Sequence, residues 1–151
     1  MIIISFTILY VAINKEELVY QTICSVLSVY HTCRDRIPNI MIMTNFEDIF
    51  FELFDTIKHP YFQQIQVVKI DQATIKHWLD DRDFCFRLKI KAIEYYFDVC
   101  NRDLLFFDGD TYLLGDISYY STLLYQKRCI LYQKIRRLDT IMKQLNICYE
   151  N

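Results

Sequence analysis

Short apolar runs alternate with amphipathic stretches along most of this chain. An apolar run bounded by turn residues predicts a buried strand, whereas apolar side chains that recur every three or four residues predict a helix. The first helical stretch carries this spacing at Leu18, Thr22, Ile23, Val26 and Tyr30. We therefore expect strands over 1–13, 40–44, 65–70 and 104–107, and helices over 15–32, 47–58 and 84–100.

The order of these elements predicts the fold class. Strands that alternate with helices indicate an α/β fold with a mostly parallel, Rossmann-like sheet and helices on both of its faces. The sequence has no Gly/Ser linker, internal repeat or low-complexity segment, so we expect a single domain over residues 1–151. The apolar start of the chain is too short to span a bilayer and no basic segment precedes it. We expect no transmembrane segment and a cytoplasmic protein.

Composition and charge narrow the choice of partners. The 151 residues are 53% hydrophobic, which is enough for a sizeable core. Lys and Arg number 17 against 19 Asp and Glu, with no basic run, which argues against nucleic acid as a partner. Aromatic residues make up 16% of the chain, and an aromatic surface could serve as an interface, so a homo-oligomer stays a possible assembly. Six isolated cysteines, with no histidine at ligand spacing, predict reduced core residues rather than a zinc site: Cys24, Cys33, Cys85, Cys100, Cys129 and Cys148.

The candidate chemistry follows the apolar run 104–107, where Gly109 separates Asp108 from Asp110. If the strand continues, both carboxylates share one face, and a glycine between them lets a phosphate approach closely. Mg²⁺ and Mn²⁺ prefer oxygen ligands and often bind one or two carboxylates together with substrate phosphates. The alternative interpretation of an isolated Asp-x-Asp is an acidic turn in solvent.

Two other acidic motifs do not fit these residues. Haloacid-dehalogenase phosphatases require threonine at the fifth position of Asp-x-Asp-x-Thr, where this chain has Tyr112. An EF-hand requires oxygen ligands at its fifth and twelfth positions and glycine at its sixth. Tyr112, Tyr119 and Leu113 occupy those three places.

The segment LLFFDGDTYLLGDIS, residues 104–118, resembles the DxD signature of glycosyltransferases with the GT-A fold. The similarity is greatest to the retaining family eight, which includes glycogenin and bacterial galactosyltransferases. It implies that Asp108 and Asp110 bind Mn²⁺ or Mg²⁺, which bridges the diphosphate of a nucleotide sugar, and that Gly109 lies against the ribose. It further implies an enzyme that transfers the sugar, with a UDP-sugar as the expected donor, to an acceptor that the sequence does not identify.

The resemblance also assigns roles at the end of the first strand. In the family this strand ends against the nucleobase. By resemblance, the base and ribose would contact Tyr10, Val11, Ala12 and Asn14. An ordinary buried strand followed by a helix cap at Asn14 is an equally good interpretation of these residues.

The helix before the motif supplies candidate cations. Arg87 and Lys91 are four residues apart and share a helical face that Glu94 continues, which an exposed ladder of charges also explains. In the family, this helix carries a basic residue that points at the diphosphate or donor sugar. The resemblance therefore implies Arg87 or Lys91 as the catalytic cation, with Lys89 as a further donor-binding residue.

After Ser118 the resemblance ends. Family members continue for more than a hundred residues and include a late His-x-x-Gly-x-x-Lys-Pro-Trp segment, whereas residues 119–151 contain no His, Gly, Pro or Trp. We therefore expect either a fragment truncated after the DxD region or a compact relative that keeps donor binding. Two other functions remain open: a degenerate, non-catalytic binding or assembly module whose aromatic tail packs on a partner, and a metal-dependent nucleotidyl or phosphoryl enzyme.

Overall fold

The computed structural model of the protein describes residues 6–33, 37–80, 84–100, 102–115 and 117. Contacts divide the chain into two units, Met1–Ile117 and Ser118–Asn151. Every described residue belongs to the first unit. Several expectations lie outside the described residues: those for residues 1–5 of the first strand, for residues 116 and 118 of the resemblance, for Cys129 and Cys148, and for the aromatic tail.

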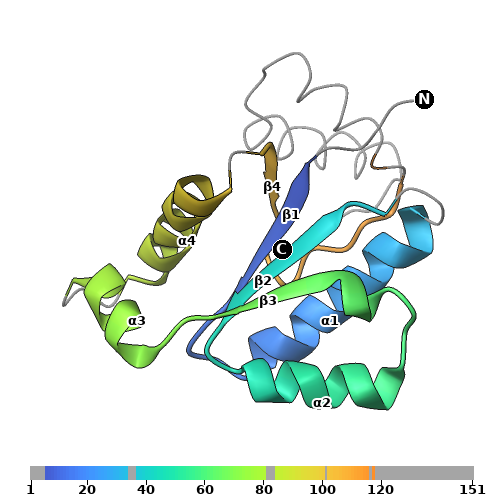
Figure 1. The fold of residues 1–151 in the computed structure, drawn as a ribbon, viewed down its shortest axis with the longest axis horizontal. Coiled ribbons are helices and arrows are strands. Elements are labelled where there is room, and N and C mark those ends of the chain that lie inside the picture. Colours follow the sequence, from blue (N-terminus) through green and yellow to red (C-terminus); the bar gives the residue numbers. More distant parts are fainter. Residues whose placement is uncertain (1–5, 34–36, 81–83, 101, 116, 118–151) are drawn as a thin grey trace, which may run out of the picture. The chain divides into compact units, whose positions relative to one another are not determined.

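The first unit is built on a four-stranded sheet in which every strand pair is parallel (Figure 1). Its order is β3-β2-β1-β4, so β1 is central and β4 lies beside it. In the register of the sheet, Ile8 of β1 aligns with Ile40 of β2 and Leu105 of β4. The strands are β1 (Thr7–Ala12), β2 (Asn39–Thr44), β3 (Ile65–Lys69) and β4 (Leu104–Phe106).

Helices cover both faces of this sheet, which confirms the predicted α/β class (Figure 1). They are α1 (Glu17–Cys33), α2 (Glu47–Ile57), α3 (Gln72–Leu79) and α4 (Cys85–Val99), with a short 3-10 helix η1 (Phe62–Gln64). Alternation along β1 separates the faces, because neighbouring strand residues point in opposite directions. Tyr10 points to α1, where its hydroxyl meets Ser25, whereas Leu9 and Val11 pack in the cluster that contains the buried residues of α3 and α4.

The buried side chains explain why these segments adopt these elements. All six residues of β1 are buried, as expected for a central parallel strand covered on both faces. On α4, Leu88, Ala92 and Tyr96 recur at helical spacing and form the buried side of the helix. Each large apolar side chain removed from water in this way stabilises the fold by roughly 1.5–3 kcal/mol.

Each predicted strand and helix overlaps an element of the structure, with two omissions, η1 and α3. Helix α3 was not expected from the pattern, although Asp71 begins it as an N-cap whose side chain accepts a hydrogen bond from the Thr74 amide at 2.7 Å. The cysteine prediction is partly wrong. Cys33 is buried, but Cys24 and Cys85 are exposed rather than in the core. No helix in the described ranges is both long and apolar enough to cross a membrane.

Candidate functional site at the carboxyl ends of β1 and β4

The order of the strands places the Asp-x-Asp segment at a distinctive position. Along the chain, β2 is added beside β1 and β3 beside β2, and β4 is then added on the opposite side of β1. The direction in which successive strands are added therefore reverses between β1 and β4. In open α/β sheets, ligands bind beyond the carboxyl ends of the strands at this kind of switch point. Asp108 follows β4 at this edge, and the Phe107 amide still donates to the Leu9 carbonyl oxygen of β1 at 3.0 Å.

The two aspartates lie in a turn rather than in a continuing strand. Strand β4 ends at Phe106, and the Thr111 amide donates to the Asp108 carbonyl oxygen at 2.9 Å. This bond closes a four-residue β-turn with Gly109 and Asp110 at its centre. The strand therefore does not continue through Asp110, so the condition under which both carboxylates would share a strand face is not met, because the chain leaves the sheet to cross α1.

Gly109 is explained by its contact with α1. A Cβ atom at this position would stand 2.9 Å from Thr22 Oγ1 and 3.5 Å from the Leu18 carbonyl oxygen. No glycine in the described ranges has a positive φ, so the backbone conformation does not itself require glycine here. A side chain at position 109 would therefore point at α1. Because glycine has none, the turn can approach the helix closely.

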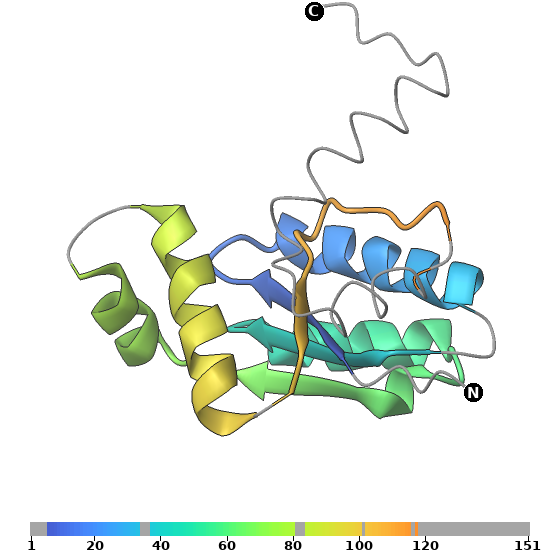
Figure 2. The same ribbon diagram turned by 90° about the horizontal axis from the view of Figure 1, so that it is seen from above.

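A row of hydroxyl groups on α1 holds the segment that follows the turn. Ser25 donates to the Thr111 carbonyl oxygen, and the Leu113 amide donates to Ser28 Oγ at 2.9 Å. Thr32 Oγ1 lies 3.1 Å from the Leu113 carbonyl oxygen. Figure 2 shows this segment running along α1 after β4. The hydroxyls fix the path of the chain on the carboxyl side of the two aspartates.

Lys89 is the predicted cation that the structure brings to the aspartates. Its Nζ lies 2.5 Å from Asp108 Oδ1, and both side chains are partly exposed, at 31% and 48% respectively. The same ammonium lies 5.1 Å from the centre of the Phe86 ring, within the range of a cation–π contact. Asp110 is exposed and forms no ion pair with the other described residues.

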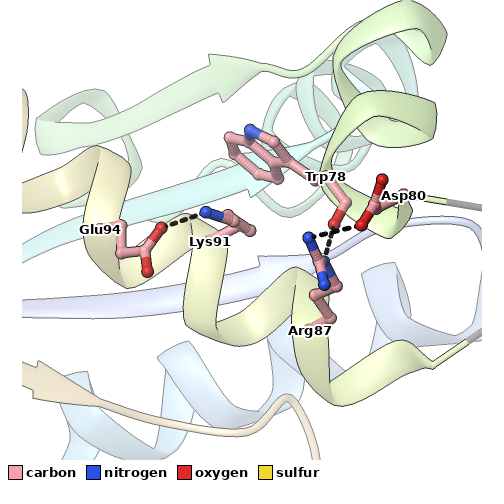
Figure 3. Close-up of polar contacts among 5 residues, drawn as sticks. All are labelled: Trp78, Asp80, Arg87, Lys91 and Glu94. Atoms are coloured by element: carbon pink, nitrogen blue, oxygen red, sulfur yellow. Dashed lines mark hydrogen bonds and ion pairs between the residues drawn. The ribbon is translucent and has the colours of Figure 1, made fainter. Parts of the chain in front are cut away.

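Arg87 and Lys91 have partners other than the aspartates of the turn: Figure 3 shows Arg87 beside Trp78 and Asp80, and Lys91 beside Glu94. Arg87 Nε donates to the Trp78 carbonyl oxygen at 2.6 Å, and its Nη2 lies 3.3 Å from Asp80 Oδ2. Both partners lie at the carboxyl end of α3. Lys91 pairs with Glu94, three residues along the same helix, at 2.6 Å.

Of the four residues expected around the base and ribose, only Asn14 is exposed. Tyr10, Val11 and Ala12 are buried in β1, and burial raises the pKa of the Tyr10 hydroxyl. Asn14 has the left-handed φ of 68°, which asparagine tolerates better than most residues, and its amide donates to Asn45 Oδ1 at 2.9 Å. Asn14 is therefore the residue of this set whose side chain can reach a ligand.

The oxygen donors of the turn are compatible with a hard divalent cation. Asp108 and Asp110 provide two partly or fully exposed carboxylates within three residues. In the described ranges, no group of three or more His, Cys, Asp and Glu side chains gathers to hold a metal ion. Two carboxylates would thus leave several positions of an octahedral shell for substrate oxygens and water. Carboxylate oxygens are the type of ligand that Mn²⁺ and Mg²⁺ prefer in proteins.

A cavity of about 420 Å³ lies at the opposite, amino-terminal edge of the sheet. Its wall includes Thr7, Asn39, Gln66 and Arg102 but none of the predicted site residues. The cavity has no carboxylate in its wall, so it does not replace the Asp-x-Asp turn as the candidate site.

The pattern of the sequence did not reveal the residues that support the turn. Thr22, Ser25, Ser28 and Thr32 recur at intervals of three or four residues on α1, which is the one signal that could have indicated a polar stripe. Asn45, which holds the backbone at Asn14, follows β2 at the same edge of the sheet. Comparisons of the chain with protein-family models, curated proteins and solved structures found no match.

Proposed function

We propose that this domain binds a nucleotide-diphosphate sugar together with Mn²⁺ or Mg²⁺ and transfers the sugar to an acceptor. The observation that carries the proposal is the position of the Asp108–Thr111 turn, which lies where β4 ends beside β1 at the switch point of a parallel sheet. The resemblance of residues 104–118 to the DxD signature supports the same ligand. A UDP-sugar is the first donor to test.

Asp108 and Asp110 would hold the divalent ion in this proposal. When bound, such an ion supplies Lewis-acid stabilisation of the charge that develops on the leaving diphosphate. Lys89 is the protein cation that we assign to the phosphates, in place of Arg87 and Lys91, because its ammonium already lies at Asp108. A fixed positive charge beside a leaving phosphate favours the more highly charged transition state. Asn14 is the residue that we assign to the base or ribose.

A second candidate function is a non-catalytic binding or assembly module. Helix α4 carries an exposed apolar side on which Phe86, Ile90 and Phe97 are each more than half exposed. Apolar side chains grouped in this way are typical of a surface that another protein covers. A metal-dependent nucleotidyl or phosphoryl enzyme is the third candidate, because it would use the same two carboxylates.

Calorimetry and donor turnover separate these candidates. UDP, GDP and CDP are titrated into the full chain with Mn²⁺ and again with EDTA. Sugar conjugates of each nucleotide that binds are then assayed for release of the nucleoside diphosphate. We expect UDP to bind when Mn²⁺ is present and not in EDTA, and we expect a UDP-sugar to release UDP. Binding without release would favour the non-catalytic module, and cleavage of the diphosphate bond to give a nucleoside monophosphate and sugar 1-phosphate would favour the third candidate. No binding of any nucleotide would refute the proposed function.

A further inference from the structure

The contact between Lys89 and Asp108 bears on the order in which ligands bind. Lys89 is on α4 and reaches across to the first residue of the turn, so an element on one face of the sheet neutralises a carboxylate at its edge. Asp110 in the same turn has no such partner among the described residues. The turn therefore presents about one uncompensated negative charge to a cation instead of two.

We infer that Lys89 is an internal counter-ion that occupies Asp108 in the ligand-free protein and moves to the phosphates when a metal-bound nucleotide diphosphate arrives. This inference rests on the proposed function, because it assigns a regulatory role to a residue of the same site. Its consequence is that the divalent ion binds weakly alone and strongly with nucleotide. The coupling is reciprocal: each ligand raises the affinity for the other by the same factor.

The surroundings of Lys89 permit this exchange. The ion pair is partly open to water, and exposed pairs stabilise a protein only slightly, so a diphosphate can compete for the ammonium. Lysine has a flexible four-carbon stem and three donors, which suit a charge that changes partners. The Phe86 ring 5.1 Å from Nζ offers a second favourable contact that keeps the ammonium near the turn after it leaves Asp108.

The test compares Mn²⁺ binding with and without UDP in Lys89→Met and in the wild-type chain. Free Mn²⁺ is measured by electron paramagnetic resonance, and UDP affinity is measured by calorimetry at saturating Mn²⁺. Without UDP, we expect Lys89→Met to bind Mn²⁺ several-fold more tightly, because Asp108 is released. With Mn²⁺, we expect its UDP affinity to fall about tenfold, since a charge-assisted contact with phosphate is lost.

Three controls make the result specific to Lys89. Lys76→Met removes an exposed charge from α3 and should leave both affinities unchanged. Lys89→Arg keeps the charge and should retain most of the coupling. Lys89→Gln gives a polar neutral variant for comparison if Lys89→Met folds poorly.

The outcomes distinguish this inference from the proposed function. If wild-type protein binds UDP in a Mn²⁺-dependent manner but Mn²⁺ affinity without UDP is unchanged or weaker in the neutral Lys89 variants, the counter-ion role is overturned and the proposed function stands. If wild-type protein shows no Mn²⁺-dependent UDP binding, the proposed function fails and the counter-ion role fails with it.

Discussion

The contact between Gly109 and α1 gives a prediction that can be tested by a double-mutant cycle. In Gly109→Ala, the new Cβ would stand 2.9 Å from Thr22 Oγ1, closer than such atoms normally approach, so the helix or the turn must shift. Overpacking of this kind costs about 1–3 kcal/mol. Alanine also restricts the unfolded chain, which offsets about 0.4–1 kcal/mol of this cost. We expect Gly109→Ala to lower the free energy of unfolding by about 1–2 kcal/mol.

Thr22→Ala should remove that clash. The nearest remaining atoms would be the Leu18 carbonyl oxygen at 3.5 Å and the Thr22 amide nitrogen at 3.6 Å, both ordinary contacts. The buried Thr22 hydroxyl has no hydrogen-bond partner among the described residues, so its removal leaves no described group unpaired. We therefore expect the Gly109→Ala/Thr22→Ala protein to be more stable than the sum of the single changes by about 1 kcal/mol or more.

Urea denaturation of the four proteins measures this coupling, with Thr22→Ser as the matched control. Serine keeps the hydroxyl and should not rescue Gly109→Ala. Additivity of the two changes to within about 0.3–0.5 kcal/mol, or equal rescue by serine, would refute the packing explanation of Gly109. The double variant also tests the ligand interpretation. Normal UDP affinity in a folded Gly109→Ala/Thr22→Ala protein would show that the glycine serves packing and not the approach of a phosphate.

Three further predictions concern residues around this edge of the fold. Arg87→Met should lower the thermal midpoint by about 2–4 °C, since it loses a bond to α3, while calorimetry finds UDP affinity unchanged; a large loss of affinity would restore Arg87 to the site. Tyr10→Phe should also lower the thermal midpoint and leave UDP affinity unchanged, because it removes a buried hydrogen bond to Ser25 and no exposed group. The Thr74 amide holds the pKa of Asp71 below its usual value. The stabilisation from the ionised carboxylate is therefore fully present above about pH 4 and is lost as the pH falls below that value. Asp71→Asn should therefore lose less stability than wild type between pH 5 and pH 2 in thermal melts; equal loss would contradict this role.

The alternating pattern predicted the sheet and most helices because their apolar residues are spaced by the geometry of burial. The same pattern did not reveal helix α3, because only Ile75 and Trp78 of its eight residues are buried, which is too few to establish a period. That omission also affected the candidate site. Arg87 and Lys91 share a helical face, but the partners of Arg87 lie at the end of α3, so that face could not be assigned correctly without this helix.

The turn at Asp108 could not be derived from local pattern for a related reason. Its shape depends on Thr22 and on the hydroxyl row of α1, about 85 residues earlier in the sequence. The apolar run 104–107 indicated a strand correctly, but nothing local shows that the chain then leaves the sheet. Lys89 of α4 contacts Asp108, which follows β4, and this contact is visible only once both elements are placed.

The proposed function depends above all on whether the Asp-x-Asp turn binds a nucleotide diphosphate through a divalent ion. Calorimetry of UDP with Mn²⁺ tests this binding for the wild type, Asp110→Asn and Asp103→Asn. Asp103 is an exposed aspartate just before the other end of β4, so it matches the change of charge without altering the turn. We predict that Asp110→Asn weakens UDP binding about tenfold or more, the effect of one charge-assisted contact of roughly 1.5–3 kcal/mol, and that Asp103→Asn does not. UDP binding that survives EDTA, or that Asp110→Asn leaves unchanged, would show that the turn does not bind the nucleotide through a metal ion.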